Sequence, residues 1–286
     1  MGLLERFTIG FGMVRRSGRV LGSHPKLLVF PLVGGLSGIA FIATLFGSLF
    51  LAGSLLEDPG PALYGALFVA YLVETFVASF FSAALVSATR TAFEGETPAI
   101  RAAMATAWNR KGPLVAWSVV AALVGVVLRA IESSDNLVAR LLAGLFAVAW
   151  GVMTYFVVPV IVFRNPSVRE MFSESAATFK HTWGESLGAM GTISAVTFLL
   201  GIPGVVLGAF TFIAVPSGGG GRVLAAVLVG GSVLLLGLLV GQSLTGVAKT
   251  ALYVYATGGD TPEHFEDMDF DRLGDDSGGG THTARI

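Results

Sequence analysis

The chain has 286 residues, of which 53% are hydrophobic and only 13% are charged, and it contains no cysteine. A soluble domain carries about 25% charged residues, so this composition indicates a membrane protein and excludes an ordinary soluble one. The lack of cysteine excludes disulfides and thiolate chemistry, and the net charge of −1 argues against a nucleic-acid partner.

Six segments are long and apolar enough to cross a bilayer. A spanning helix needs about 20 mostly apolar residues. Helices are favoured over a barrel because the short alternating strands of a barrel are absent. The sequence therefore predicts an all-α, polytopic membrane bundle of six transmembrane helices. The expected spans lie near 27–56, 62–90, 113–131, 137–163, 187–215 and 223–255.

An amphipathic segment precedes each pair of spans. Apolar residues recur at helical spacing in each segment and oppose charged residues. Such helices lie in the membrane interface or cap the end of the bundle, and the sequence leaves both open. The apolar faces are Leu3, Phe7, Phe11, Val14 and Leu21; Ile100, Met104 and Ala107; and Val168, Met171, Phe172, Ser175, Phe179 and Trp183.

The order of one amphipathic segment and two spans occurs three times, which predicts a threefold internal repeat. Short sequence echoes support it, because residues 98–101 (PAIR) resemble residues 166–169 (PSVR). Parallel repeats of this kind occur in transporters, but duplication also builds bundles that bind nothing.

Basic residues are concentrated on one side of the predicted spans. Fifteen of the 18 Lys and Arg residues fall in the N-terminal arm, the 90–112 and 164–186 loops and the C-terminal side, where Lys249 is included. Only Arg129, Arg140 and Arg222 fall on the other side. By the positive-inside rule, both termini are expected in the cytoplasm and the protein in the cell membrane.

Residues 260–286 are expected to form an acidic, disordered cytoplasmic tail, separate from a transmembrane domain at 1–259. Eight Asp and Glu residues lie in this tail, followed by a glycine run. Such a composition cannot bury enough apolar surface to fold. The tail either keeps the protein soluble or docks on the basic N-terminal arm.

Two stretches resemble a known family. Residues 23–31 (SHPKLLVFP) enter the first span and residues 251–258 (ALYVYATG) leave the last one. Together with the six-span layout, they resemble a family of uncharacterised archaeal and bacterial integral membrane proteins. That family is distantly similar to the membrane domains beside some glycerophosphodiester phosphodiesterases. The phosphodiesterase domain is absent here, and the resemblance implies no functional residues.

Glu74 is the one ionisable residue near the middle of a predicted span. A buried carboxyl usually faces protein or water, because exposing it to lipid is costly. Glu74 is either a proton- or cation-binding group, or a neutral group hydrogen-bonded to a neighbouring helix, and no cationic partner is evident at its depth. The candidate polar site is the stripe of residues at helical spacing around it: Tyr71, Glu74, Thr75, Ser79 and Ser82, with Ala78 between them.

Glycine and proline mark further positions within the spans. Pro159 and Pro203 are expected to kink their helices, beside a ligand cavity or as ordinary membrane prolines. Small residues four apart let helices approach closely, within the chain or between copies. These pairs are Gly34/Gly38, Gly184/Gly188, Gly204/Gly208 and Gly237/Gly241.

No nucleophile–base pair and no metal-ligand spacing is evident, so we expect no enzyme activity, no catalytic residues, no metal and no cofactor. The first hypothesis is an integral membrane protein with a structural, scaffolding or lipid-interacting role. Its partners would be membrane lipids, together with other membrane proteins or further copies of itself. The alternative is a secondary transporter or channel for a small solute or ion that uses Glu74. A water-accessible cavity at Glu74 would distinguish the two.

Overall fold

The computed structural model describes residues 3–51, 61–183, 188–215, 219–258 and 265. All regular secondary structure in these residues is helical. Six helical segments are long and apolar enough to cross a membrane. The prediction of an all-α bundle with six spans is therefore confirmed.

The helices form three hairpins, each preceded by one amphipathic helix, as the predicted repeat requires. The first unit comprises α1 (Leu3–Ser23), the short 3-10 helix η1 (Pro25–Leu28), α2 (Val29–Leu51) and α3 (Pro61–Phe93). The second comprises α4 (Ile100–Asn109), α5 (Lys111–Glu132), α6 (Leu137–Thr154) and α7 (Val157–Arg164). The third comprises α8 (Val168–Trp183), α9 (Gly188–Ala214) and α10 (Gly219–Ala256).

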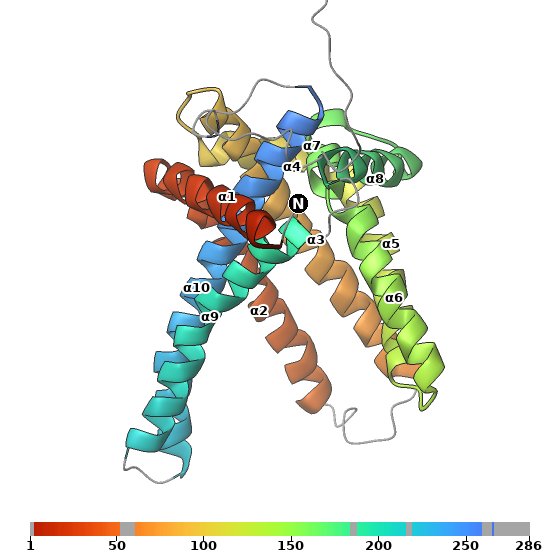
Figure 1. Cartoon of the computed structure of the whole chain (residues 1–286). Coiled ribbons are helices and arrows are strands. Elements are labelled where there is room, and N and C mark those ends of the chain that lie inside the picture. Colours follow the sequence, from red (N-terminus) through yellow and green to blue (C-terminus); the bar gives the residue numbers. More distant parts are fainter. Residues whose placement is uncertain (1–2, 52–60, 184–187, 216–218, 259–264, 266–286) are drawn as a thin grey trace, which may run out of the picture.

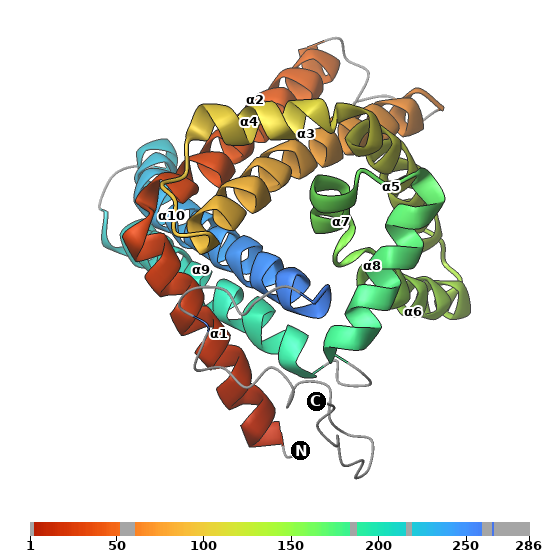
Figure 2. The same cartoon turned by 90° about the horizontal axis from the view of Figure 1, so that it is seen from above.

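The molecule has two distinct ends. Figure 1 shows α1, α4 and α8 at one end, which we call the amphipathic end, and the C-terminal ends of α2, α5 and α9 at the other, the hairpin end. Seen from above, the amphipathic helices surround the ends of α3, α7 and α10 (Figure 2). Arg129 and Arg140 flank the α5–α6 connection at the hairpin end.

The buried core lies at the amphipathic end. Leu27 and Phe30 of the first unit, Phe156 and Ile161 of the second, and Leu252 of the third belong to one cluster of fully or almost fully buried side chains. Away from this core the hairpins diverge, and large apolar side chains of α6, α9 and α10 are exposed. In a bilayer these side chains would face acyl chains, so they need no protein partner.

The three amphipathic helices pack one face on the core and leave other apolar side chains exposed. Met13 and Ser17 of α1 and Met171 of α8 are buried. Phe11 is 63% exposed and Val168 is 45% exposed, so the apolar faces predicted for α1 and α8 pack on the core only in part. The helices cap the bundle, and they also present apolar side chains where an interfacial helix would.

Local sequence signals explain several helix ends. The Asn136 side chain accepts hydrogen bonds from the backbone N–H groups of Val138 and Ala139 at 3.0 and 3.2 Å and caps α6. Before α8, the Glu170 carboxylate accepts hydrogen bonds from the N–H and the hydroxyl of Ser167 at 2.8 and 2.7 Å. These bonds hold the pKa of Glu170 below its usual value.

The predicted fourth span is confirmed as one apolar segment, Leu137–Arg164, which is divided into the helices α6 and α7. The helix breaks at Tyr155 and Phe156. Pro159 has no N–H to donate to the carbonyl of Tyr155, which weakens the helix at this point. The backbone N–H of Phe156 instead donates to the Ser175 hydroxyl of α8 at 3.0 Å. In contrast, Pro203 lies inside the continuous helix α9.

The close pairing of α9 and α10 depends on glycine. A Cβ atom at Gly237 would collide with the carbonyl group of Leu200 on α9. The predicted pairs Gly204/Gly208 and Gly237/Gly241 thus pack within the chain, and so does Gly34/Gly38, against α3. Gly184 lies outside the described residues.

Only Phe265 of the predicted acidic tail is described. Its ring is fully buried and lies edge-on to Phe93 at the end of α3, with the ring centroids 5.9 Å apart. The rest of 260–286, and the predicted docking on the N-terminal arm, lie outside the described residues.

Candidate functional site

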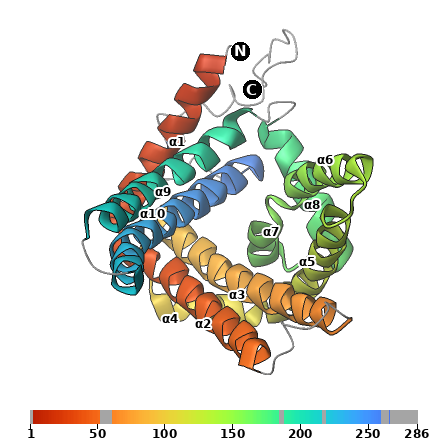
Figure 3. The same ribbon diagram turned by 90° about the horizontal axis from the view of Figure 1, so that it is seen from below.

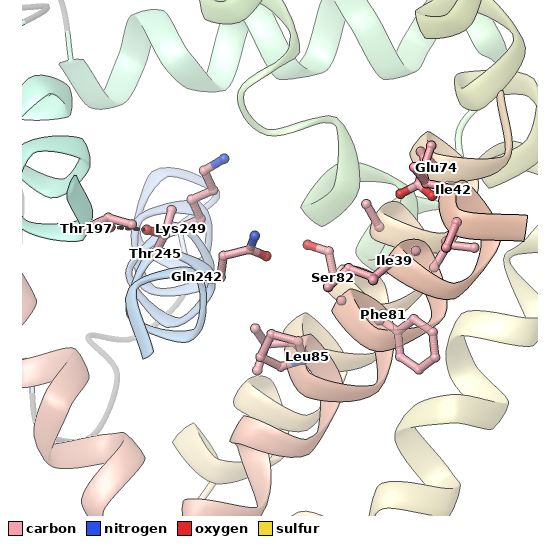
Figure 4. A pocket seen from close by; sticks show the side chains of 18 residues that line it. Ile39, Ile42, Glu74, Phe81, Ser82, Leu85, Thr197, Gln242, Thr245 and Lys249 are labelled. Carbon is pink, nitrogen blue, oxygen red and sulfur yellow. Dashed lines mark hydrogen bonds between the residues drawn. The ribbon is translucent and has the colours of Figure 1, made fainter. Parts of the chain in front are cut away.

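A cavity of about 680 Å³ lies between the α2/α3 hairpin and the α9/α10 hairpin (Figure 4). Its wall on the α2 side is mainly apolar and includes Gly38, Ile39 and Ile42. Its wall on the α10 side carries Gln242, Thr245 and Lys249. The α3 helix contributes Glu74, Val77, Ala78, Phe81, Ser82 and Leu85, and α9 contributes Thr197.

Polar side chains meet across this cavity. In Figure 4, Gln242 of α10 and Ser82 of α3 point toward one another. The Thr197 hydroxyl lies 3.3 Å from the Thr245 hydroxyl, which donates to the carbonyl of Gly241 at 2.9 Å. The Gln242 amide makes no hydrogen bond with any residue that the structure describes, so its donors and acceptor are available to a ligand.

The Glu74 carboxyl is packed against α2. Its Oε2 atom would lie 2.6 Å from a Cβ atom at Gly38, so the carboxyl would have to shift if that position carried a side chain. Its Oε1 atom is buried without a hydrogen-bond partner among the described residues. The predicted hydrogen bond from Glu74 to a neighbouring helix is therefore not formed in that part of the chain.

The structure divides the predicted polar stripe between two neighbours of α3. Glu74 and Ser82, with Ala78, line the cavity. Ser79 faces α5 instead, where its hydroxyl accepts a hydrogen bond from Trp117 Nε1 at 3.0 Å.

Tyr71 also belongs to the α5 side of the stripe. Its ring lies against the backbone of α5, within 3.4 Å of a Cβ position at Gly125. Thr75 does not line the cavity. Residues spaced along one stripe of a helix cover an arc wide enough to meet two partners, which is why the predicted site is split.

Lys249 is the functional candidate that sequence reasoning missed. The distribution of basic residues assigns Lys249 to the cytoplasmic C-terminal side, whereas in the structure it lies within α10 and lines the cavity. Its Nζ atom lies 4.2 Å from the centroid of the Tyr155 ring, a cation–π contact. The apolar run over 251–256, which continues the helix beyond Lys249, was the available signal.

Glu74 and Lys249 occupy different depths of the cavity. Gly246 of α10 packs against Leu85 of α3, which fixes the relative level of the two helices. Glu74 precedes Leu85 by eleven residues of α3, a rise of about 16 Å along the helix axis. The two ionisable groups therefore lie toward different ends of the cavity, and they form no ion pair.

Comparison with known proteins identifies a family. The profile of DUF6159, described as a family of unknown function, matches residues 62–263. The chain belongs to DUF6159. The region shared with the DUF6159 profile runs from α3 through α10, so it includes Glu74 and Lys249 but not the α2 wall of the cavity. No curated protein and no solved structure matches the chain.

The cavity of this DUF6159 member offers one carboxyl, one ammonium, hydroxyls and an amide. No group of three or more His, Asp or Glu side chains is gathered anywhere in the described ranges, so a metal ion would find at most a single carboxylate here. These groups can bind a charged or hydrogen-bonding ligand and exchange a proton with it.

Proposed function

We propose that this protein is a lipid-interacting membrane protein that holds one amphiphilic molecule in the cavity between α2/α3 and α9/α10. The observation that carries this proposal is the asymmetry of the cavity wall. Aliphatic side chains such as Ile39 and Ile42 line the deeper part of the cavity, and the polar groups of Gln242, Thr245 and Lys249 line the part nearer the amphipathic end. A ligand with one apolar and one polar part would satisfy both walls.

The cavity has an accessible side. Ile39 lines it and is still 52% exposed, so this part of the wall is open. Seen from below, α9 and α10 diverge from α2 toward the hairpin end (Figure 3). In a bilayer such an opening would face acyl chains, which gives a lipid a direct path between α2 and α10.

The volume suits a ligand of this kind. Small-molecule sites usually measure roughly 300–1,000 Å³ and combine apolar walls with a few polar groups. The cavity of about 680 Å³ falls within that range. It would hold a lipid headgroup with part of an acyl chain.

The proposal includes an orientation and a location. We place the protein in the cell membrane with its amphipathic end and both termini in the cytoplasm, because most Lys and Arg residues belong to that end. The protein would act by binding and not by catalysis. The sequence resemblance to membrane domains beside glycerophosphodiester phosphodiesterases stays a prediction.

A cavity-filling variant tests the proposal. Ala78 lines the cavity, so Ala78→Trp should exclude the ligand. Ala147 of α6 is exposed away from the cavity, so Ala147→Trp is the matched control. The measurement is the lipid retained per protein after extensive detergent washing, by mass spectrometry. The native protein and Ala147→Trp should retain one lipid and Ala78→Trp should lose it, whereas equal retention in all three contradicts the proposal.

A second candidate function is a proton- or cation-coupled transporter, which the unpartnered Oε1 atom of Glu74 favours. A carboxyl at this depth facing a cavity is typical of coupling sites. Proteoliposomes with an internal pH dye distinguish the candidates. Proton flux in the native protein that disappears in Glu74→Gln would support the transporter. Equal dye signals, with lipid retention intact in Glu74→Gln, would support lipid binding alone.

A further inference from the structure

We infer that the amphiphile bound in this cavity has an anionic headgroup, and that the Lys249 ammonium recognises it. This inference rests on the proposed function and adds the class of ligand to it. It comes from the contacts of Lys249, the polar groups on the same helix face, and the depth at which they lie.

The positive charge of Lys249 is not neutralised by any residue that the structure describes. Ion pairs between described residues join Arg90 to Glu94 and Arg129 to Glu132, and neither involves Lys249. Glu74 also lines the cavity, but it lies about 16 Å along the α3 axis from Leu85, the residue that packs against Gly246 near Lys249. An ammonium group in a membrane cavity with no carboxylate at its own level is a site for an anion.

The Tyr155 ring holds the ammonium in place without neutralising its charge. The ring is itself fixed, because it packs edge-on against Phe156 and Phe179 with centroid distances of 4.8 and 5.7 Å. It lies at the break between α6 and α7 that Pro159 and Ser175 produce. A cation–π contact leaves the N–H groups of Lys249 free to donate to an anion on the cavity side.

Two neighbouring side chains on α10 extend this polar surface. Gln242 and Thr245 precede Lys249 by seven and four residues, so all three lie on one face of the helix. All three line the cavity. The Gln242 amide N–H groups can donate to the ester oxygens of a lipid, and its carbonyl oxygen can accept from a headgroup hydroxyl, next to the charged group that Lys249 binds.

The depth of Lys249 matches the headgroup level of a lipid. It lies seven residues before the end of α10 at Ala256, about 10 Å along the helix. Ile39 and Ile42 lie ten and thirteen residues into α2, deeper toward the hairpin end. A lipid would therefore bind with its headgroup at the amphipathic end and its acyl chain along α2.

The test compares lipids that differ in charge. The full-length protein is delipidated in detergent and titrated with phosphatidylglycerol or phosphatidylcholine, and bound lipid is counted by native mass spectrometry. Phosphatidylglycerol should bind about tenfold more tightly than phosphatidylcholine, because one charge-assisted hydrogen bond usually changes the affinity by about that factor. Lys249→Gln should reduce this preference to near unity, and Lys249→Arg should keep most of it. Arg140→Gln, at an exposed position of the hairpin end, is the charge-matched control and should change nothing.

Three outcomes would overturn the inference. Equal binding of the two lipids by the native protein would remove the anionic preference. An unchanged preference in Lys249→Gln would remove Lys249 from the recognition. Displacement of phosphatidylglycerol by an equal concentration of inorganic phosphate would show a site for free anions and not for an amphiphile. If Ala78→Trp leaves the binding of both lipids unchanged, the proposed function fails as well, so the two failures can be told apart.

Discussion

At the scale of single residues, isolated hydroxyl groups satisfy the polar groups that the apolar helices leave unpaired. Ser79 accepts the indole N–H of Trp117, and Ser175 accepts the backbone N–H of Phe156. Both serines are buried. A buried donor without a partner costs more than an ordinary hydrogen bond contributes, so these two serines matter more than their exposed neighbours.

Ser175→Ala should lower the free energy of unfolding by about 1–3 kcal/mol, because it leaves the Phe156 N–H buried and unpaired. The measurement is the unfolding midpoint in a denaturing-detergent titration. Ser173→Ala on the same helix is the control, since the Ser173 hydroxyl is exposed and donates to the carbonyl groups of its own helix. Equal shifts in the two variants would mean that the bond to Phe156 contributes little.

At the scale of helices, neighbouring helices are held together in different ways. The α9/α10 hairpin relies on direct backbone contact at glycine, whereas α2 contacts α3 through Phe81 and Glu74, which fit over Gly34 and Gly38. The α3/α5 contact includes the Ser79–Trp117 hydrogen bond. Backbone contact tolerates no added atom, so substitutions at α9/α10 should be the least well tolerated.

Gly237→Ala should destabilise the α9/α10 hairpin, because its methyl group would overlap the carbonyl of Leu200. Overpacking of this kind costs about 1–3 kcal/mol. Gly231→Ala on α10 is the matched control, since its nearest neighbour would be a Val227 methyl at 4.0 Å. In the same detergent titration, the unfolding midpoint of Gly237→Ala should be lower than that of Gly231→Ala. Identical midpoints would contradict a tight α9/α10 interface.

At the scale of the whole molecule, charge and architecture agree. The core and the amphipathic helices lie at one end, and the three hairpins extend from it (Figure 1). Arg129 and Arg140 are at the opposite end, while Lys and Arg residues of the 90–112 and 164–186 segments are at the amphipathic end. This asymmetry is what the positive-inside rule uses to set orientation.

The missing cysteines allow a direct test of that orientation. Two single-cysteine variants are treated with an impermeant thiol reagent on intact cells. They are Ser134→Cys, in the α5–α6 connection, and Asn109→Cys, at the end of α4. Ser134→Cys should react and Asn109→Cys should react only after lysis, because the basic end stays inside. The reverse pattern would invert the topology, and with it the leaflet in which Lys249 meets a headgroup.

The sequence alone determined the number of spans, their approximate ends and the order of amphipathic helix and hairpin. These features depend on the length of apolar runs and on helical periodicity, which are local properties of the chain. Tertiary structure decided the break at Tyr155, because Pro159 only weakens the helix there and the hydroxyl that satisfies Phe156 comes from Ser175 on another helix. It also separated Glu74 and Ser82, which face the cavity, from Tyr71 and Ser79, which face α5. The position of Lys249 in the cavity was decided in the same way, since the crossing of α10 over α3 determines which face of α10 lines the cavity.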